Sequence, residues 1–299
     1  MPFISNAAIK IGVEEGYFQE QGIDVQPVLL KGTNETLALL ATGEIDVGIP
    51  ALNPGLYNAV AAGAAMRIVL PLTVHRVQDC TTVALMARQE DIDSGRLANP
   101  ADWAGLKVMV TDAGPSSTGA YYLTQVLEPA GLRLSDLQLL KGEAAIHAEA
   151  LRSGQVDMTY ELEPWVTRAT QGGGVGVLLP LEGYGHDLQA SVIVFGERLM
   201  EDRDLGVRWA TAYLKSVRQF ALGPTARNVE IAADFTGLAP ELVARLCWSI
   251  TSTDGAINTE SIMIHQNWLL SEGLIDRELA PEEFIDTGFA EEAVEILSK

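Results

Sequence analysis

Two stretches of the chain resemble each other at a distance of about 110 residues. Residues 31–47 begin with Lys-Gly, continue with an apolar helical run and end with Gly-Glu-Ile-Asp-Val; residues 141–158 follow the same order and end with Gly-Gln-Val-Asp-Met. The offset is 141 − 31 = 110 at the start and 157 − 46 = 111 at the end, whereas solenoid repeats recur every 20–50 residues. We therefore expect two similar α/β lobes with a cleft between them, the kind of place where small ligands bind.

Strand and helix patterns alternate around these repeats. Strands are predicted at 23–30, 45–49, 68–74, 81–87, 108–110, 175–179 and 191–195, and helices at 7–18, 34–43, 53–62 and 118–128. Alternation of this kind indicates an α/β fold with a mixed, mainly parallel sheet in each lobe.

The repeat also predicts a strand that precedes the chain. In the second lobe the strand at 107–110 comes before a loop and its helix, and subtracting about 109 places its counterpart at residues −2 to 1. Our hypothesis is that Met1 is not the biological start and that an upstream strand, with or without a signal peptide, belongs to the protein.

Composition narrows the class of protein. The net charge is −20, with 40 acidic and 20 basic residues, so the chain lacks the cationic surface that binds nucleic acid. No apolar run approaches 18 residues, and no signal peptide is recognisable.

Cys80 and Cys247 could form one disulfide or remain as two buried thiols, and their apolar, β-like surroundings favour thiols. The four scattered histidines form no metal-ligand pattern with them, and we expect no cofactor.

The loop at 111–119, Thr-Asp-Ala-Gly-Pro-Ser-Ser-Thr-Gly, is the strongest candidate for ligand binding. It lies between a predicted strand and a helix, where backbone N–H groups and hydroxyls could bind a carboxylate, sulfonate, phosphate or heterocycle edge. The alternative is that its serines only cap the helix. Candidates at the equivalent strand ends of both lobes are Ser5, Asn6, Thr33, Asn34, Asn53, Ser116, Ser117 and Thr118, since ligands of open α/β sheets bind beyond the carboxyl ends of the strands.

A second group of candidates follows the strand that ends the second repeat. Glu161 and Glu163 could act as an acid and base pair, but one ligand-contacting acid and one capping acid is the favoured interpretation. Aromatic and histidine side chains add stacking or hydrogen-bonding surfaces, each with core packing or ordinary hydrogen bonding as the alternative. These candidates are His75, Tyr121, Tyr122, Trp165, Tyr184 and His186.

The order of these elements resembles a known family. Five segments occur in the order found in type II periplasmic binding proteins. They are Gly22-Ile23-Asp24-Val25, residues 37–47, Asp-Trp-Ala-Gly-Leu-Lys-Val at 102–108, the loop at 114–118, and Gly-Gln-Val-Asp at 154–157 followed by Glu163-Pro164. The resemblance is to the binding proteins of ABC importers for nitrate, sulfonates or taurine, and thiamine precursors.

The resemblance implies a Venus-flytrap protein. Lobe I would hold residues 1–85 and 190–299, lobe II residues 86–189, and hinge strands near 83–88 and 190–195 would join them. The protein would be a periplasmic or extracellular monomer that captures a small solute between its lobes and delivers it to a membrane permease. Neutral hydroxyls and amides beside two carboxylates favour a nitrogen heterocycle, such as a pyrimidine precursor, over a bare inorganic anion; a sulfonate-like anion is the other candidate.

Two other functions remain open from the sequence. Enzymes of the menaquinone pathway and thiamine pyrimidine synthases share this fold, and here Glu161, Glu163 or His75 would supply the acid and base. A ligand-sensing regulator would also fit the fold, although no DNA-binding helix-turn-helix flanks the lobes. Turnover of a candidate ligand would separate an enzyme from a binding protein.

Overall fold

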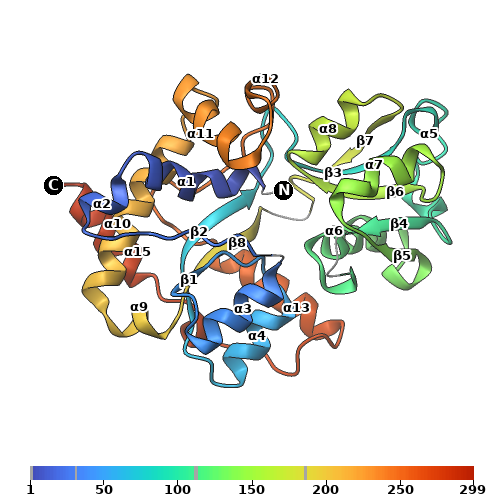
Figure 1. The fold of residues 1–299 in the computed structure, drawn as a ribbon. Helices are drawn as coiled ribbons and strands as arrows, with labels where there is room; N and C mark the ends of the chain where they lie inside the picture. The colour runs from blue at the N-terminus through green and yellow to red at the C-terminus, as the bar shows by residue number, and fades with distance from the viewer. Residues whose placement is uncertain (1–2, 31, 111–113, 185–186) are drawn as a thin grey trace. The chain divides into compact units, whose positions relative to one another are not determined.

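The chain forms two compact units (Figure 1), shown in a computed structural model that describes residues 3–30, 32–110, 114–184 and 187–299. The first unit comprises Met1–Val74 and Leu188–Lys299, and the second comprises His75–Asp187. Each unit has its own sheet. Among the described residues no helix is long and apolar enough to cross a membrane.

The first unit is built on a three-stranded sheet with the order β1-β8-β2. Its strands are β1 (Val47–Gly48), β8 (Leu188–Phe195) and β2 (Arg67–His75). β1 runs antiparallel to β8, with Val47 opposite Phe195. β2 and β8 are apolar and buried over nearly their whole length, as expected for strands that are covered on both faces.

Helices pack on this sheet and supply most of the first unit's core. The described helices are η1 (Ile4–Asn6), α1 (Ala7–Glu14), α2 (Tyr17–Glu20), α3 (Thr33–Thr42), α4 (Pro54–Ala61), α9 (Glu197–Glu201), α10 (Arg203–Phe220), α11 (Ala226–Thr236), α12 (Pro240–Val243), α13 (Thr259–Ser271), α14 (Pro281–Phe284) and α15 (Gly288–Leu297). The helix predicted at 7–18 is split, because Gly16 adopts a left-handed conformation with φ 75°. A Cβ on Gly12 would lie 2.1 Å from the Ser216 hydroxyl, so α1 packs closely on α10.

The strand predicted at 23–30 is not formed. This segment belongs to neither sheet, and its apolar residues Val28 and Leu29 are 63% and 72% exposed. Its alternating pattern is that of a strand, but a strand also requires a neighbour to pair with, and none lies beside it among the described residues.

The second unit is built on a five-stranded sheet with the order β5-β4-β6-β3-β7. Its strands are β3 (Val83–Arg88), β4 (Lys107–Val110), β5 (Gln138–Lys141), β6 (Met158–Leu162) and β7 (Val175–Pro180). β4 is parallel to β5 and β6, whereas β3 is antiparallel to both β6 and β7. Four strands therefore run in one direction and β3 alone opposes them, which confirms the mixed α/β class.

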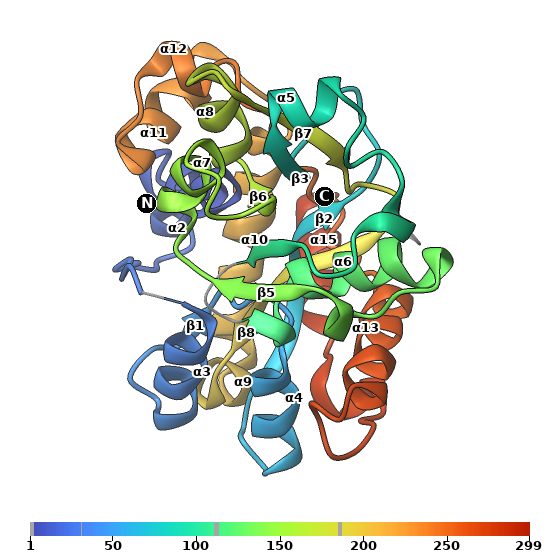
Figure 2. The same cartoon turned by 90° about the vertical axis from the view of Figure 1, so that its right-hand side faces the viewer.

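Helices cover both faces of this second sheet, as Figure 2 shows for α6 and α7 around the labelled strands. The described helices are α5 (Gln89–Asp93), η2 (Pro100–Asp102), η3 (Gly114–Ser116), α6 (Thr118–Leu127), η4 (Glu128–Ala130), η5 (Leu134–Asp136), α7 (Ala144–Arg152) and α8 (Trp165–Gln171). α6 packs so closely on β6 that a Cβ on Gly119 would lie 2.7 Å from the Tyr160 ring. Glu161, the next residue of β6, bonds to His147 of α7. Since successive strand residues point to opposite faces, α6 and α7 lie on opposite sides of the sheet.

The expectation of two buried thiols is wrong. Cys80 and Cys247 are both disulfide-bonded, and the described residues include no free cysteine. Cys247 is buried as expected, but Cys80 is exposed in a bend between β2 and β3 rather than within a strand. Disulfides persist in oxidising compartments and are rare in reducing ones.

Candidate functional site

The carboxyl ends of the parallel strands carry several predicted site residues in the second unit. β4 ends at Val110, β5 at Lys141 and β6 at Leu162. The loop and helix after β4 carry Ser116, Ser117 and Thr118, and the end of β6 carries Glu161. Parallel strands place these positions along one edge of the sheet.

The N-terminus of α6 has the geometry of a capped helix. Ser117 is the N-cap, its Oγ accepts the Ala120 N–H at 3.1 Å, and its side chain is 4% exposed. Ser116 and Thr118, on either side, are half-buried. The cap therefore accounts for the Ser117 hydroxyl, while backbone N–H groups of the first turn point out of the helix. Asp112 and Ala113 lie outside the described residues.

Glu161 forms a buried pair with His147, a residue that the sequence analysis missed. His147 Nδ1 lies 2.7 Å from Glu161 Oε1, and the two side chains are 0% and 2% exposed. His147 Nε2 lies 3.2 Å from the Gly142 carbonyl, to which it donates. The second oxygen, Glu161 Oε2, is buried and has no hydrogen-bond partner among the described residues.

The repeat carried a signal for His147. At an offset of 110 its counterpart is Leu37, a buried apolar residue of α3. A histidine in place of a buried leucine needs polar partners, because an unpaired buried imidazole is costly. A comparison of the two repeats position by position would have selected His147 as a special residue.

Burial and pairing act in opposite directions on the protonation of this pair. Burial alone would lower the pKa of His147, but the hydrogen bond and charge of Glu161 outweigh it and raise that pKa above 6.5. Burial also raises the pKa of Glu161 above 4.5, and His147 opposes this only in part. The two groups share one proton near neutral pH, so Glu161 does not present an uncompensated negative charge.

Glu163 has a structural role instead of completing an acid and base pair. Its carboxylate accepts the Thr167 N–H at 3.1 Å and the Thr167 hydroxyl at 2.6 Å, in the first turns of α8. It is 4% exposed. Of the two interpretations drawn from the sequence, the structure favours a capping role for Glu163. Trp165, the first residue of α8, is half-buried with the Arg168 guanidinium 4.8 Å from its ring centroid.

His75 belongs to an aromatic stack on the α6 side of the second sheet. Its Nδ1 lies 2.9 Å from the Tyr122 hydroxyl, and the two rings are 5.8 Å apart. Tyr122 also stacks on Tyr160 at 6.3 Å. Burial lowers the pKa of His75 to about 4, so the ring is neutral near pH 7. Tyr121 and Tyr122 are buried, which agrees with the core-packing alternative. Tyr184 is half-buried in the turn before β8, and His186 lies outside the described residues.

The first unit brings three of its predicted residues together at the corresponding strand end. Asn53 caps α4 by accepting the Leu56 N–H at 3.2 Å, and its Nδ2 donates to Asn34 Oδ1 at 3.0 Å. The Thr33 hydroxyl accepts the Ala51 N–H at 3.2 Å. Gly32, and not Thr33 or Asn34, is the N-cap of α3. Ser5 and Asn6 lie in η1, directly before α1, and both are half-buried.

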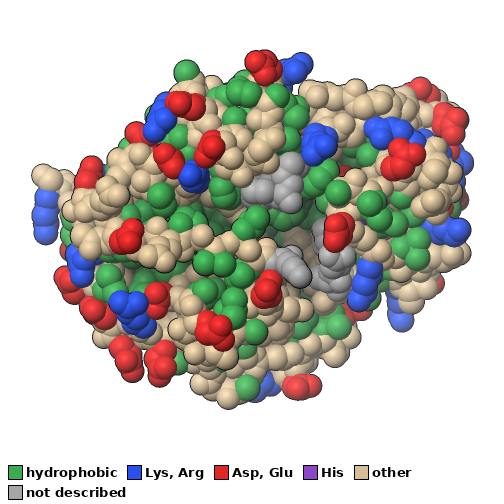
Figure 3. Space-filling model, viewed as in Figure 1, with side chains coloured by type: hydrophobic (Ala, Val, Ile, Leu, Met, Phe, Trp, Pro, Cys, Tyr) green, Lys and Arg blue, Asp and Glu red, His purple; other side chains and the backbone are tan. Residues whose placement is uncertain are grey.

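On the face drawn in Figure 3, charged side chains do not mark a competing site. Figure 3 shows acidic side chains scattered over the visible face rather than gathered in one patch. A surface hollow of about 540 Å³ lies beside α9 and is lined by Glu197, Arg198, Glu201, Asp202 and Arg203. None of these is a predicted ligand residue. No group of three or more metal-ligating side chains occurs within the described part of the chain.

Comparisons with known proteins agree with the fold described above. The chain has a TM-score of 0.77 and 13% identity to the ligand binding component of an ABC-type import system from Staphylococcus aureus, covering 98% of this chain and 96% of that one. The periplasmic aliphatic sulphonate binding protein SsuA from Escherichia coli gives a TM-score of 0.73 and 17% identity, with 94% of each chain covered. The desulfurization enzyme DSZB gives 0.67 and 16%, with 97% of this chain and 96% of that chain covered.

These structural neighbours share the type II periplasmic binding protein fold, as the sequence predicted. No curated protein matches the sequence. The family model described as NMT1/THI5 like matches residues 5–225, which is most of the chain. The chain therefore belongs to the NMT1/THI5-like family.

Proposed function

We propose that the protein is the extracytoplasmic solute-binding component of an ABC importer. One observation supports binding over catalysis more than any other. Two of the three acid and base candidates are already engaged, His75 with Tyr122 and Glu163 with Thr167, and both cysteines are disulfide-bonded. Catalytic thiols act as thiolates, and a disulfide offers none. The family and the shared fold are consistent with this role.

The proposed ligand is a small nitrogen heterocycle with N–H donors. Glu161 Oε2 is an acceptor without a partner among the described residues, and a buried acceptor of this kind favours a ligand that donates to it. Ser116 and Thr118, in the same unit as Glu161, are the proposed further contacts, and Thr33, Asn34 and Asn53 of the first unit stay predictions as ligand contacts. The remaining candidates stay predictions as ligand contacts: Ser5, Asn6, His75, Ser117, Glu163, Trp165 and Tyr184.

A sulfonate-like anion is the second candidate ligand. The shared proton of His147 and Glu161 removes the like-charge repulsion that weighed against an anion in the sequence analysis. Backbone N–H groups at the start of α6 could then bind the sulfonate oxygens. The solved sulphonate-binding neighbour makes this candidate worth testing.

Location and partner follow from the same proposal. A disulfide-bonded chain suits the periplasm or another oxidising space. The proposed partner is the membrane permease of the importer, which would receive the ligand-bound protein.

A thermal-shift screen with native mass spectrometry tests the proposal. The panel holds pyrimidines, thiamine precursors, sulfonates and nitrate, and each mixture is analysed afterwards for chemical change. A ligand at 100 times its dissociation constant should stabilise the protein by about 2.7 kcal/mol. One ligand that stabilises the protein and returns unchanged supports a binding protein; conversion of the ligand would instead support an enzyme.

Variants separate the ligand classes. Glu161→Gln should weaken a heterocycle that donates to Glu161 by at least about tenfold, because one buried charge-assisted bond is lost. A sulfonate should bind Glu161→Gln about as well as the parent. Thr225→Ala is the matched control, since Thr225 caps α11 through the Asn228 N–H at 3.2 Å, in a helix that carries no predicted ligand residue. A ligand whose affinity falls equally in Thr225→Ala would contradict the proposed site.

A further inference from the structure

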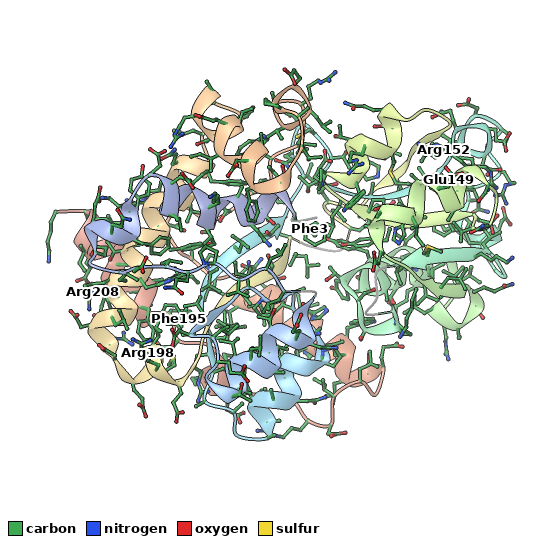
Figure 4. All side chains as sticks on the ribbon, in the orientation of Figure 1. Phe3, Glu149, Arg152, Phe195, Arg198 and Arg208 are labelled. Atoms are coloured by element: carbon green, nitrogen blue, oxygen red, sulfur yellow. The ribbon has the colours of Figure 1, made fainter. Side chains whose placement is uncertain are left out.

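A chain of hydrogen bonds in the first unit joins the backbone of α4 to the side chain of Asn34. The Leu56 N–H donates to Asn53 Oδ1 at 3.2 Å, and Asn53 Nδ2 donates to Asn34 Oδ1 at 3.0 Å. α3, which carries Asn34, lies beside α4 in Figures 1 and 2, and the side chains of both helices are drawn in Figure 4. A Cβ on Gly55 would lie 3.1 Å from Asn34 Oδ1 and 3.2 Å from Asn53 Oδ1, so the absence of a side chain there leaves room for the two amides to meet.

The backbone of α4 fixes the direction of this chain of hydrogen bonds. A backbone N–H can only donate, so the atom of Asn53 that caps α4 must be its oxygen. The nitrogen of Asn53 then faces Asn34, and a donating nitrogen requires the oxygen of Asn34 opposite it. Asn34 is exposed, and its remaining group, Nδ2, makes no hydrogen bond to another described residue. Asn34 therefore offers N–H donors to its surroundings.

Thr33, the neighbour of Asn34, has the same polarity. Its Oγ accepts the Ala51 N–H at 3.2 Å, which leaves the hydroxyl proton free to donate. Gly32, the N-cap of α3, has no side chain that could accept from the N–H groups of the first turn. The partial positive charge at the start of a helix acts in the same sense, since it favours groups that carry negative charge.

The second repeat shows that the fold does not require these two amides. The counterpart of Asn34 is Ala144, since 144 − 34 = 110, and that of Asn53 is Glu163, since 163 − 53 = 110. Alanine has no polar side chain, and the carboxylate of Glu163 accepts the N–H and hydroxyl of Thr167. The helices α7 and α8 form without a matching amide pair, which favours a role in recognition for the pair in the first unit.

We infer that the start of α3 selects solutes by hydrogen-bond polarity. Asn34 and Thr33 donate to an acceptor oxygen of the solute, which is a carbonyl, carboxylate or sulfonate oxygen. Asn53 is a positioning residue, because it acts through Asn34 and determines which end of that amide faces the solute. A solute with only N–H donors at this position would leave donors facing donors, and unpaired donors weaken binding. This inference rests on the proposed solute-binding function, but the orientation of Asn34 can be measured without any solute.

Asn53→Asp tests that orientation in the free protein. Aspartate is as good an N-cap as asparagine, so the Leu56 N–H keeps its acceptor. The new carboxylate cannot donate to Asn34, and we expect the Asn34 amide to turn over and donate to it. In NMR spectra one Asn34 Nδ2 proton should then exchange about fivefold more slowly than in the parent, because it gains a hydrogen bond.

Asn58→Asp is the matched control for charge. Asn58 is an exposed residue of α4, so this variant adds the same charge without changing Asn53 or Asn34. It should leave the exchange of the Asn34 amide as in the parent. Equal exchange of that amide in Asn53→Asp and in the parent would overturn the inference.

Titration of the isotope-labelled parent with the solute panel tests recognition. Uracil and methanesulfonate represent neutral and anionic acceptors, and both are needed because Glu35 adds a carboxylate to the first turn of α3; methylammonium offers donors alone. We expect an acceptor to shift the Asn34 amide resonances, and the one that does so separates a carbonyl from a sulfonate. It should bind Asn53→Asp at least about tenfold more weakly and Asn58→Asp as well as the parent.

A second variant keeps the test open if Asn53→Asp does not fold. Asn34 is exposed, and Asn34→Asp can still accept from Asn53 but offers no donor to a solute, so it should weaken binding of the acceptor by a similar factor. A shift of the Asn34 amide by methylammonium would overturn the inference. The two failures are distinguishable, because no binding by any panel member contradicts the proposed function, whereas binding that leaves the Asn34 amide unshifted overturns this inference alone.

Discussion

The buried pair of His147 and Glu161 allows a quantitative prediction for His147→Ala. The substitution removes the 2.7 Å bond to Glu161 and the 3.2 Å bond to the Gly142 carbonyl. Glu161 is then left 2% exposed without its histidine, and its Oε2 already has no hydrogen-bond partner among the described residues. Removing one partner of a buried ion pair costs about 3–5 kcal/mol, and we expect a loss of this size at pH 7.

The pH dependence of this loss identifies its cause. Without His147, burial raises the pKa of Glu161 further above 4.5. The folded variant then binds more protons than the unfolded chain, so its stability falls as pH rises from about 4.5 to the folded pKa. The slope is about 1.4 kcal/mol per pH unit in that range. Urea unfolding of the parent and variant at several pH values between 5 and 8 measures it.

The double variant His147→Ala with Glu161→Gln is the matched control. Glutamine keeps the shape of the side chain and cannot ionise, so the extra slope should vanish and stability at pH 7 should partly recover. The two substitutions are in contact and should therefore be strongly non-additive. Equal slopes for His147→Ala and the double variant would refute the reasoning, because the loss would then come from packing alone.

Three further predictions concern other described contacts. Asn53→Ala should lower the free energy of unfolding by about 2 kcal/mol in urea, because a helix cap and the bond to a neighbouring amide are both lost. Thr225→Ala loses a cap alone and should lower it by about 1 kcal/mol. Equal losses for the two variants would contradict this. His75 should titrate near pH 4 in NMR spectra. The native state should lose stability as pH falls from 6.5 towards 4, because the histidine of the unfolded chain takes up a proton first. A His75 titration midpoint above pH 6.5 would contradict its burial. Cys80 and Cys247 should not react with thiol reagents in the unfolded, non-reduced protein, and labelling of both would contradict the disulfide.

Patterns that depend on neighbours in sequence were predictable. The helices at 53–62 and 118–128 and the buried strands at 68–74 and 191–195 were all found within a few residues. These elements carry their own caps and apolar runs, so the signal lies within a short window. The resemblance predicted that the first lobe ends at residue 85 and resumes at residue 190. The compact units of the structure divide after Val74 and before Leu188, which keeps β3 in the same unit as its partners β6 and β7.

Features that depend on distant partners were not predictable in the same way. Residues 23–30 have the alternation of a strand, yet no strand lies beside them among the described residues. Glu161 could be selected from its place after a strand, but its partner His147 is 14 residues away on a helix. The capping role of Glu163 required the position of Thr167 in α8. In each case the sequence showed one participant of an interaction, and the fold supplied the other.

The shared proton of His147 and Glu161 has a consequence for the energetics of ligand capture. A ligand that donates to Glu161 favours the ionised carboxylate and thereby the protonated imidazole, so it changes how tightly the pair retains its proton. Binding should then exchange a fraction of a proton with the buffer. Calorimetry in two buffers of different ionisation enthalpy would give different apparent binding enthalpies for the parent protein. The same pair of buffers should give equal enthalpies for Glu161→Gln. Under the proposed function, the affinity for such a ligand would depend on the acidity of the compartment in which the protein binds it.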